Sequence, residues 1–323
     1  MHMSLNKTLI VFAMSCGVLT SGSAWSADYP NKAIRMIVPY SAGGGADNAA
    51  RIIAKTLGDT LKQPIVIENK PGASGSIGAT QVARAPADGY TLLYDASSFS
   101  INPVLRKLPY NPLKDFIAVS KVVSSPYLMV VPTNSAYDSV KSYVDAAKAS
   151  PGKLTFASYG IGSPVHIVGE LLKQETGVDI VHVPYKGGAP ALVDVMGGVV
   201  DTYFANAASA MSYIRGDKLK ALATTAAKRS SDLPDVATMT EQGVKMDVSE
   251  WNGIFAPAGT PEPVISKLSE AIGTALKDPA TIRQLNNLGM QVEGSSPEAF
   301  KSFITNELTR WDAVAKKNNI RLD

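Results

Sequence analysis

Short apolar runs alternate with amphipathic stretches along the first part of the chain. Runs at 34–39, 64–69 and 90–97 predict strands, and apolar residues three to four positions apart over 47–61 predict a helix between the first two. A glycine-rich loop, a short helix and an Asp-Gly turn occupy 70–90. Strand and helix therefore alternate, which predicts an α/β fold with a parallel sheet and helices on its faces.

The same alternation returns after residue 126. Its predicted strands lie at 127–132, 154–158, 179–185, 199–205 and 219–225, with helices at 138–149, 163–176 and 190–197. A strand, a Pro-rich turn and a helix are predicted over 251–279, and helices at 279–288 and 297–317 end the chain.

Two α/β runs without a flexible linker predict two lobes joined by crossing strands. The chain is expected to leave the first lobe near 124–127 and to return near 251–255. Lobe one then comprises 28–124 and 251–323, and lobe two comprises 125–250.

The first 27 residues have the layout of a secretory signal peptide. Lys7 is the only charged residue before Asp28, an apolar run covers 9–19, and small polar residues follow. The run is about half of the ~20 residues that a membrane span needs. Cleavage after Ala27 is one of several positions that the small residues at 22–27 allow. We expect an exported protein that is soluble in the periplasm.

Composition removes several classes of function. Cys16 is the only cysteine and lies in the predicted signal peptide, so thiol catalysis, disulfides and cysteine metal sites are excluded after cleavage. A lipoprotein cysteine would need a large aliphatic residue where Ala13 stands. Without Lys7 the chain keeps 30 basic and 28 acidic residues, and no basic run appears. Nucleic acid is therefore not an expected partner.

A glycine-rich loop, "YSAGGGADN" at 40–48, joins the first predicted strand to the first predicted helix. Glycine lets a ligand approach the backbone closely. The start of the following helix offers unpaired N–H groups and a partial positive charge. The loop is therefore a candidate anion site that needs no lysine or arginine.

A second loop, "SYGIGSPVH" at 158–166, also follows a strand and opens a helix. Ser163 is the expected N-cap, Pro164 the first helical residue, and Gly177 the C-terminal stop. Taken alone, each glycine-rich loop is more simply interpreted as a connection between a strand and a helix than as a binding site. Their matched positions in two lobes favour a clamp that holds an anion from both sides, because ligands of open α/β sheets bind beyond the carboxyl ends of the strands.

The catalytic alternatives lack essential residues. "GGGADN" has no Gly-Lys-Ser/Thr ending, "GASGSIG" has the wrong glycine spacing for a dinucleotide, and no Gly-x-Ser-x-Gly elbow exists. His166 and His182 are the only histidines after residue 27, and they have no carboxylate or cysteine cluster for a metal. His166 is a candidate ligand contact or loop-orienting residue, whereas His182 is expected to be structural. We therefore predict a binding protein without a cofactor rather than an enzyme, with a hydrolase as the enzymatic alternative.

Aromatic residues lie beside both loops. Tyr40, Tyr159 and Tyr203 could form the walls of a pocket for an apolar or aromatic carboxylate, or belong to the core or its rim. For Phe204 the core is favoured.

The chain from about residue 29 onward resembles the Bug-type periplasmic solute-binding proteins, the receptors of tripartite tricarboxylate transporters. The resemblance rests on "YPNKAIRMIVPYSAGGGADNAARIIA", "VIENKPGASGSIGA", "APADGYTLL", "YKGGAPALVDVMGGVVD", "GDKLKALA" and "WNGIFAPAGTPEPVI", in that order. It implies a type II, two-lobed Venus-flytrap fold with two crossing hinge strands. It also implies that backbone groups and ordered waters of the two loops hold the carboxylate of a small organic acid or amino acid.

Two departures from the family pattern bear on the ligand. Phe204-Ala205-Asn206 stands where many relatives have Phe-Asp-Asn, so an acidic side chain near the site is expected to be absent, which disfavours a ligand ammonium group. Tyr159 replaces a smaller residue or proline and could narrow the pocket or stack on a ring. An aromatic or dicarboxylic acid is therefore favoured over an amino acid.

The expected partners are the organic acid and the membrane subunits of the transporter, with the receptor acting as a monomer. A ligand-dependent partner of a membrane sensor kinase is the alternative, because the same binding event would serve either recipient. The expected ligand-binding residues are Tyr40, Ser41, Ala42, Gly43, Gly44, Asp47, Ser97, Ser98, Ser158, Tyr159, Gly162, Ser163, His166, Tyr203 and Asn206.

Overall fold

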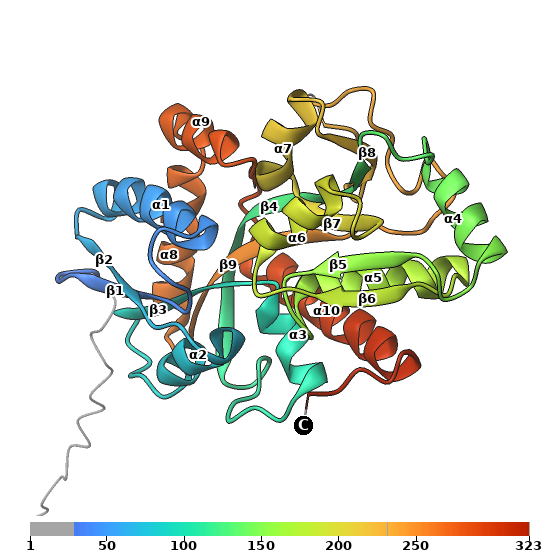
Figure 1. Cartoon of the computed structure of the whole chain (residues 1–323). Helices are drawn as coiled ribbons and strands as arrows, with labels where there is room; N and C mark the ends of the chain where they lie inside the picture. Colours follow the sequence, from blue (N-terminus) through green and yellow to red (C-terminus); the bar gives the residue numbers. More distant parts are fainter. Residues whose placement is uncertain (1–28, 231, 323) are drawn as a thin grey trace, which may run out of the picture.

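The computed structural model describes residues 29–230 and 232–322 (Figure 1). The predicted signal peptide and its Cys16 lie outside the described residues. Ten strands of the described chain form one sheet, whose path runs β2-β1-β3-β9-β4-β7-β5-β6, with β8 and β10 also paired to β4. The strands are β1 (Ile34–Val38), β2 (Ile65–Asn69), β3 (Thr91–Ala96), β4 (Phe116–Pro132), β5 (Thr155–Ser158), β6 (Val181–Pro184), β7 (Thr202–Asn206), β8 (Leu219–Thr224), β9 (Ser249–Pro257) and β10 (Gln291–Val292).

The first half of the sheet is parallel at its edge, as the sequence predicts. β1 pairs with β2 and β3 in parallel, and helix α1 (Gly45–Leu61) covers one face together with α8 (Glu262–Ala275). Helix α2 (Ser76–Ala83), which follows the short turn η1 (Ala73–Gly75), covers the other face. Alternate residues of β1 belong to the two clusters, as a sheet with helices on both faces requires.

The long strand β4 connects the two halves of the sheet. Its first part pairs antiparallel with β9, from Phe116 opposite Pro257 to Pro126 opposite Ser249. From Tyr127 onward it pairs with β7 and β8 instead. The sequence pattern predicted a strand only from 127, because serines, a lysine and a proline interrupt the apolar run before it. The lobe boundaries at 124 and 251 stay a prediction.

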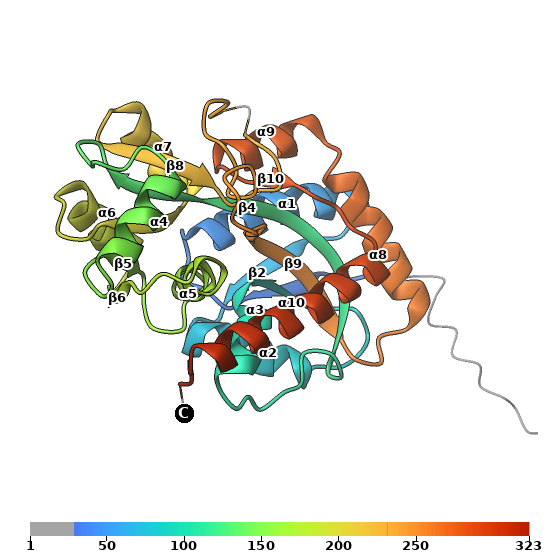
Figure 2. The same cartoon turned by 90° about the vertical axis from the view of Figure 1, so that its right-hand side faces the viewer.

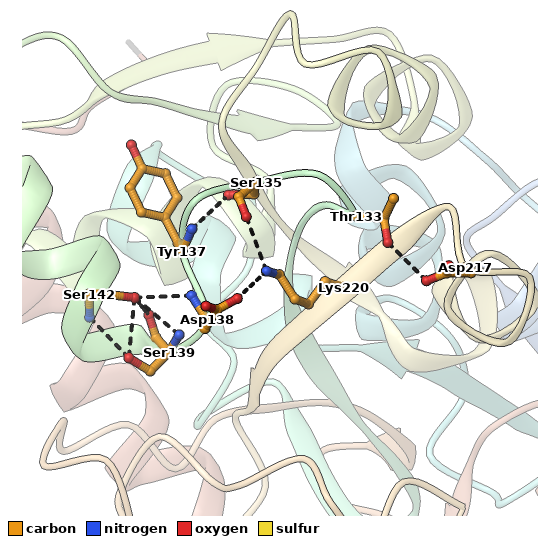
Figure 3. A network of polar contacts seen from close by, with 8 residues as sticks. All are labelled: Thr133, Ser135, Tyr137, Asp138, Ser139, Ser142, Asp217 and Lys220. Atoms are coloured by element: carbon orange, nitrogen blue, oxygen red, sulfur yellow. Dashed lines mark hydrogen bonds and ion pairs between the residues drawn. The ribbon is translucent and has the colours of Figure 1, made fainter.

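The second half of the sheet carries helices α4 (Val140–Ala149), α5 (Pro164–Thr176), α6 (Gly188–Met196) and α7 (Ala207–Arg215). β5 pairs in parallel with both β6 and β7. Figure 3 shows how the turn before α4 is held against β8: Lys220 donates to the Ser135 carbonyl at 3.1 Å and bonds Asp138. Ser139 and Ser142 close a capping box at the start of α4.

The C-terminal helix α10 (Pro297–Lys317) contacts both halves. Phe300 and Ile304 pack in a cluster with Phe255 of β9, whereas Trp311 and Val314 pack with the core of the second half. Figure 2 shows α10 lying across the molecule beside α3 (Ser98–Leu105). Helix α9 (Pro279–Asn287) lies between α8 and β10 in the sequence.

Candidate functional site: two glycine loops and the residues between them

The first glycine loop leaves several N–H groups open at the start of α1. Gly43 has a left-handed φ of 80°, and Gly44 is an N-cap without a side-chain hydrogen bond. Asn48 N–H closes the first turn on the Gly44 carbonyl at 2.9 Å. Among the described residues, no acceptor is found for the N–H groups of Gly45 and Ala46. This helix start can therefore donate to an external anion.

Asp47 supports this loop from inside. Its side chain is 1% exposed and accepts the Gly43 N–H at 2.8 Å. Arg51 and Asn69 donate to the same carboxylate at 2.9 and 2.8 Å. Burial alone would raise the pKa of Asp47, but these hydrogen bonds lower it below its ordinary value. The geometry gives Asp47, an expected ligand contact, three internal partners.

Tyr40 at the start of the loop is joined to a buried carboxyl group. Its hydroxyl donates to Asp95 Oδ1 at 2.6 Å and lies 2.6 Å from Ser98 Oγ. Burial raises the pKa of Asp95 to about 7. Ser97, which directly precedes Ser98, accepts the Trp251 N–H at 3.0 Å. Sequence reasoning missed Asp95, although an acidic residue at the end of an apolar strand was a visible signal.

The second loop repeats the internal brace of the first. Gly162 has a left-handed φ of 74°, and its N–H donates to His166 Nδ1 at 3.1 Å. In both loops, a side chain four residues further on therefore accepts the N–H of a left-handed glycine. Ser163 caps α5, Pro164 is its first residue, and Gly177 ends it in a left-handed conformation, which confirms the predicted helix signals. Ser158 Oγ accepts the Gly160 N–H at 3.1 Å and stabilises the turn.

The two histidines form a neutral stack beneath this loop. Their ring centroids are 3.9 Å apart, and the ring of Phe156 stacks beside them. Burial is the main cause that lowers the pKa of His166 to about 3 and that of His182 to about 4. A neutral His166 has the lone pair on Nδ1 that the Gly162 N–H requires. His166 thus holds the loop, and its predicted direct contact with ligand stays a prediction.

Glu250 of β9 lies opposite Ser125 of β4, close to the start of the pairing between β4 and β7. Its Oε2 is 3.5 Å from the Tyr127 hydroxyl, and Asn206 also hydrogen bonds to it. Burial raises the pKa of Glu250 above its ordinary value, although its hydrogen bonds with Asn206 and Tyr127 act in the opposite direction.

This arrangement corrects one expectation. Ala205 is fully buried in the core, and the region was expected to lack an acidic side chain. Glu250 of β9 brings a carboxyl group to Asn206 instead, and Asp95 of β3 brings one to Tyr40. Both come from other strands of the sheet, so a local motif around Asn206 gave no signal for them.

The remaining expected residues lie at different depths. Ser41, Ala42, Gly43 and Gly44 are exposed, whereas Tyr203 and Phe204 are buried. Phe204 belongs to the second-half core, as expected. Within 29–230 and 232–322, no cluster of three His, Cys, Asp or Glu side chains could hold a metal ion. No helix in this part of the chain is both long enough and apolar enough to cross a membrane.

Residues 49–320 match the family model described as the tripartite tricarboxylate transporter family receptor. Protein BugT of Bordetella pertussis is 36% identical over 98% of this chain and 100% of its own length. A Rhodopseudomonas palustris protein solved with adipate is 33% identical, with a TM-score of 0.78 over 91% of this chain and 99% of its own. MatC from Rhodopseudomonas palustris with bound malate is 32% identical, with a TM-score of 0.73 over 88% of this chain and 99% of its own.

Proposed function

Because the chain belongs to the receptor family of tripartite tricarboxylate transporters, we propose that it captures a small organic carboxylate and delivers it to the membrane subunits of such a transporter. The fold is the two-lobed α/β fold of periplasmic binding proteins, and members of the family are binding proteins rather than enzymes. We propose that this receptor acts as a monomer.

The observation that carries the proposal is the pair of internally braced glycine loops. The first presents open N–H groups at the start of α1, and the second is held in shape by the same kind of bond. A carboxylate is the anion that such donors suit, and the related structures contain adipate and malate. Each helix start contributes about 0.3–1 kcal/mol through its dipole. Micromolar binding needs about 8 kcal/mol, so direct hydrogen bonds, water and apolar contacts supply the rest.

The proposed roles divide the expected residues into two groups. The backbone of 41–46 and of 160–165, with the hydroxyl of Tyr159, contacts the ligand, whereas the Tyr40 hydroxyl donates to Asp95. Asp47 and His166 hold the two backbones in position. The preference for an aromatic or dicarboxylic acid rested on two features. Tyr159 still supports it, but the absence of acidic side chains does not, since Glu250 lies near Tyr127.

Gly44→Val tests the first loop. Gly44 has a φ of −74°, and an added Cβ would approach nothing closer than the Ser41 carbonyl oxygen at 3.4 Å. The branched side chain is therefore expected to crowd the open N–H groups and abolish binding while the protein stays folded. Calorimetry with a panel of organic acids that includes adipate and malate is the measurement.

Gly273→Val in α8 is the matched control, because a Cβ there meets nothing within 4 Å. It should bind as the unmodified protein does. Undiminished affinity in Gly44→Val would show that the first loop is not the site. A folded protein that binds no acid of the panel would refute the proposed function.

A further inference from the structure

Asp95 is a buried carboxyl group that is bonded directly to the first glycine loop. Its side chain is 1% exposed, and Oδ1 accepts the Tyr40 hydroxyl at 2.6 Å and the Ala96 N–H at 2.8 Å. The Tyr40 carbonyl accepts Asn69 Nδ2 at 3.1 Å, and the same amide group donates to Asp47, the carboxylate that holds the loop. A change at Asp95 therefore reaches the loop through Tyr40.

The groups packed against Asp95 are uncharged. β9 places Gly253 opposite it, and the backbone of η1 lies so close at Gly75 that an added Cβ would be 3.5 Å from Oδ1. Tyr110, which follows α3, has a pKa raised by burial and by the charge of Asp95, and is therefore neutral. A carboxyl group in such surroundings takes up a proton more readily than an exposed one.

The charged groups of the neighbouring elements have other partners. Arg51 of α1 and Arg35 of β1 are each bonded to a carboxylate other than Asp95, and Glu250 of β9 hydrogen bonds with Asn206. The sequences of α2 and α3 contain no charged residue. Within the described chain, no Lys, Arg or His forms an ion pair with Asp95.

The hydrogen bonds from Asp95 to Ser98 run in a direction that depends on the charge of Asp95. When Asp95 is charged, Tyr40 donates its single hydrogen to the carboxylate, so Ser98, whose Oγ is 2.6 Å from the Tyr40 oxygen, donates to Tyr40. When Asp95 is protonated, it donates to the Tyr40 oxygen, Tyr40 donates to Ser98, and the Ser98 hydrogen is released. Ser98 begins α3 and is 9% exposed, so its released hydroxyl hydrogen can serve an external acceptor.

We propose that Asp95 is a positioning residue of the first loop, which takes up a proton from solvent when a ligand carboxylate binds and thereby turns the Ser98 hydroxyl from Tyr40 toward that carboxylate. The proton goes to the Asp95 carboxyl group, and each hydroxyl keeps its own hydrogen and rotates. The inference rests on the proposed function and makes capture of the acid proton-linked. Burial raises the pKa of Asp95 to about 7, so the linkage acts near neutral pH.

The dependence of affinity on pH tests this role. Because the bound ligand favours protonated Asp95, affinity should fall as the pH rises. Calorimetry with adipate, malate and the rest of the panel is expected to give binding about threefold or more tighter at pH 7 than at pH 9. Titrations at pH 7.5 in HEPES and in Tris, which differ in their heats of ionisation, should show net proton uptake. His166 and His182, with pKa values of about 3 and 4, titrate well below this range.

Two substitutions separate the proton from the hydroxyl. Asp95→Asn keeps the shape without a charge, so it should bind equally well at both pH values and take up no proton. Ser98→Ala should weaken binding more at pH 7 than at pH 9, because only protonated Asp95 releases that hydroxyl. Asp59→Asn, exposed on α1, is the control and should keep the full dependence on pH.

Equal affinity of the unmodified protein at both pH values, without proton uptake, would refute the role of Asp95 while carboxylate capture stands. The same holds if Asp95→Asn keeps the full dependence at an unchanged melting temperature. If Asp95→Asn does not fold, an equal loss at both pH values in Ser98→Ala refutes the role by itself. If no acid binds at either pH, the proposed function is wrong and this inference falls with it.

Discussion

At the scale of single residues, two side chains with different chemistry perform one task. Asp47 uses a carboxylate and His166 a neutral imidazole nitrogen, and each accepts the N–H of the glycine four residues before it. Loop backbones so held are preorganised for a ligand, which lowers the entropy that binding must overcome.

Asp47→Asn tests the first brace. The amide keeps the shape but weakens the bonds from Arg51 and Gly43, so we expect the free energy of unfolding to fall by about 1–3 kcal/mol. Urea denaturation at pH 7 is the measurement. Asp59→Asn, exposed on the same helix, should change little. Equal effects of the two substitutions would mean that Asp47 has no special role.

His166 predicts a dependence of stability on pH. Its pKa is lowered to about 3 in the folded protein, whereas an unfolded histidine titrates near 6.5. Between these values the unfolded chain binds more protons, so the stabilisation is complete above about pH 6.5 and is lost as the pH falls toward 3. Urea denaturation from pH 7.5 to 4 should show this loss. In His166→Gln the slope should be shallower, although His182 still titrates, and an unchanged slope would contradict the assignment.

The two site loops could be predicted from the sequence because glycine and capping signals are local. Asp95 could not be grouped with the first loop, since its proximity to Tyr40 arises from the pairing of β1 with β3. The sequence also could not show which side chains contact a ligand and which hold a loop in shape. Asp47 and His166 look the same in sequence whether they face a ligand or their own loop.

At the scale of elements, local sequence signals predicted a helix correctly where it has a strong cap and an apolar stripe. α5 begins and ends at the residues that its Ser-Pro and Gly signals indicate. α3 and α7 were missed: α3 contains Pro103 and several Ser and Asn residues, and α7 is rich in small residues. Burial against neighbouring elements, rather than propensity, stabilises α3, whose Phe99, Ile101 and Leu105 are all in the core.

Ser139→Ala should destabilise α4. The Ser139 side chain accepts the Ser142 N–H at 3.1 Å and completes the capping box shown in Figure 3. Loss of such a cap costs about 1 kcal/mol. Thermal and urea unfolding measure the change, with Ser150→Ala, exposed at the other end of the helix, as the control. A loss no larger than that of the control would show that the cap contributes nothing.

At the scale of the whole molecule, β4, β9 and α10 are among the described segments that join the two halves. The helix contributes through Glu307, which accepts the indole N–H of Trp311 at 2.8 Å and that of Trp251 at 3.3 Å. One buried carboxyl group therefore links the C-terminal helix to a crossing strand.

Trp311→Ala tests this connection. It removes a side chain that is 2% exposed and leaves Glu307 with one donor fewer, so we expect a loss of about 3–5 kcal/mol in the free energy of unfolding. Lys317→Ala, exposed on the same helix, is the control. Fluorescence and circular dichroism should report one common transition in the unmodified protein. A loss below about 1 kcal/mol would show that α10 is not needed to join the halves.

The position of α10 also bears on when the protein can fold during its synthesis. The core of the second half contains Trp311 and Ile320, and the Leu322 N–H bonds the Leu105 carbonyl at 2.9 Å. The core of the first half needs β9 and α8. Neither half can therefore complete its core on the ribosome until the C-terminal segments that belong to it have been made.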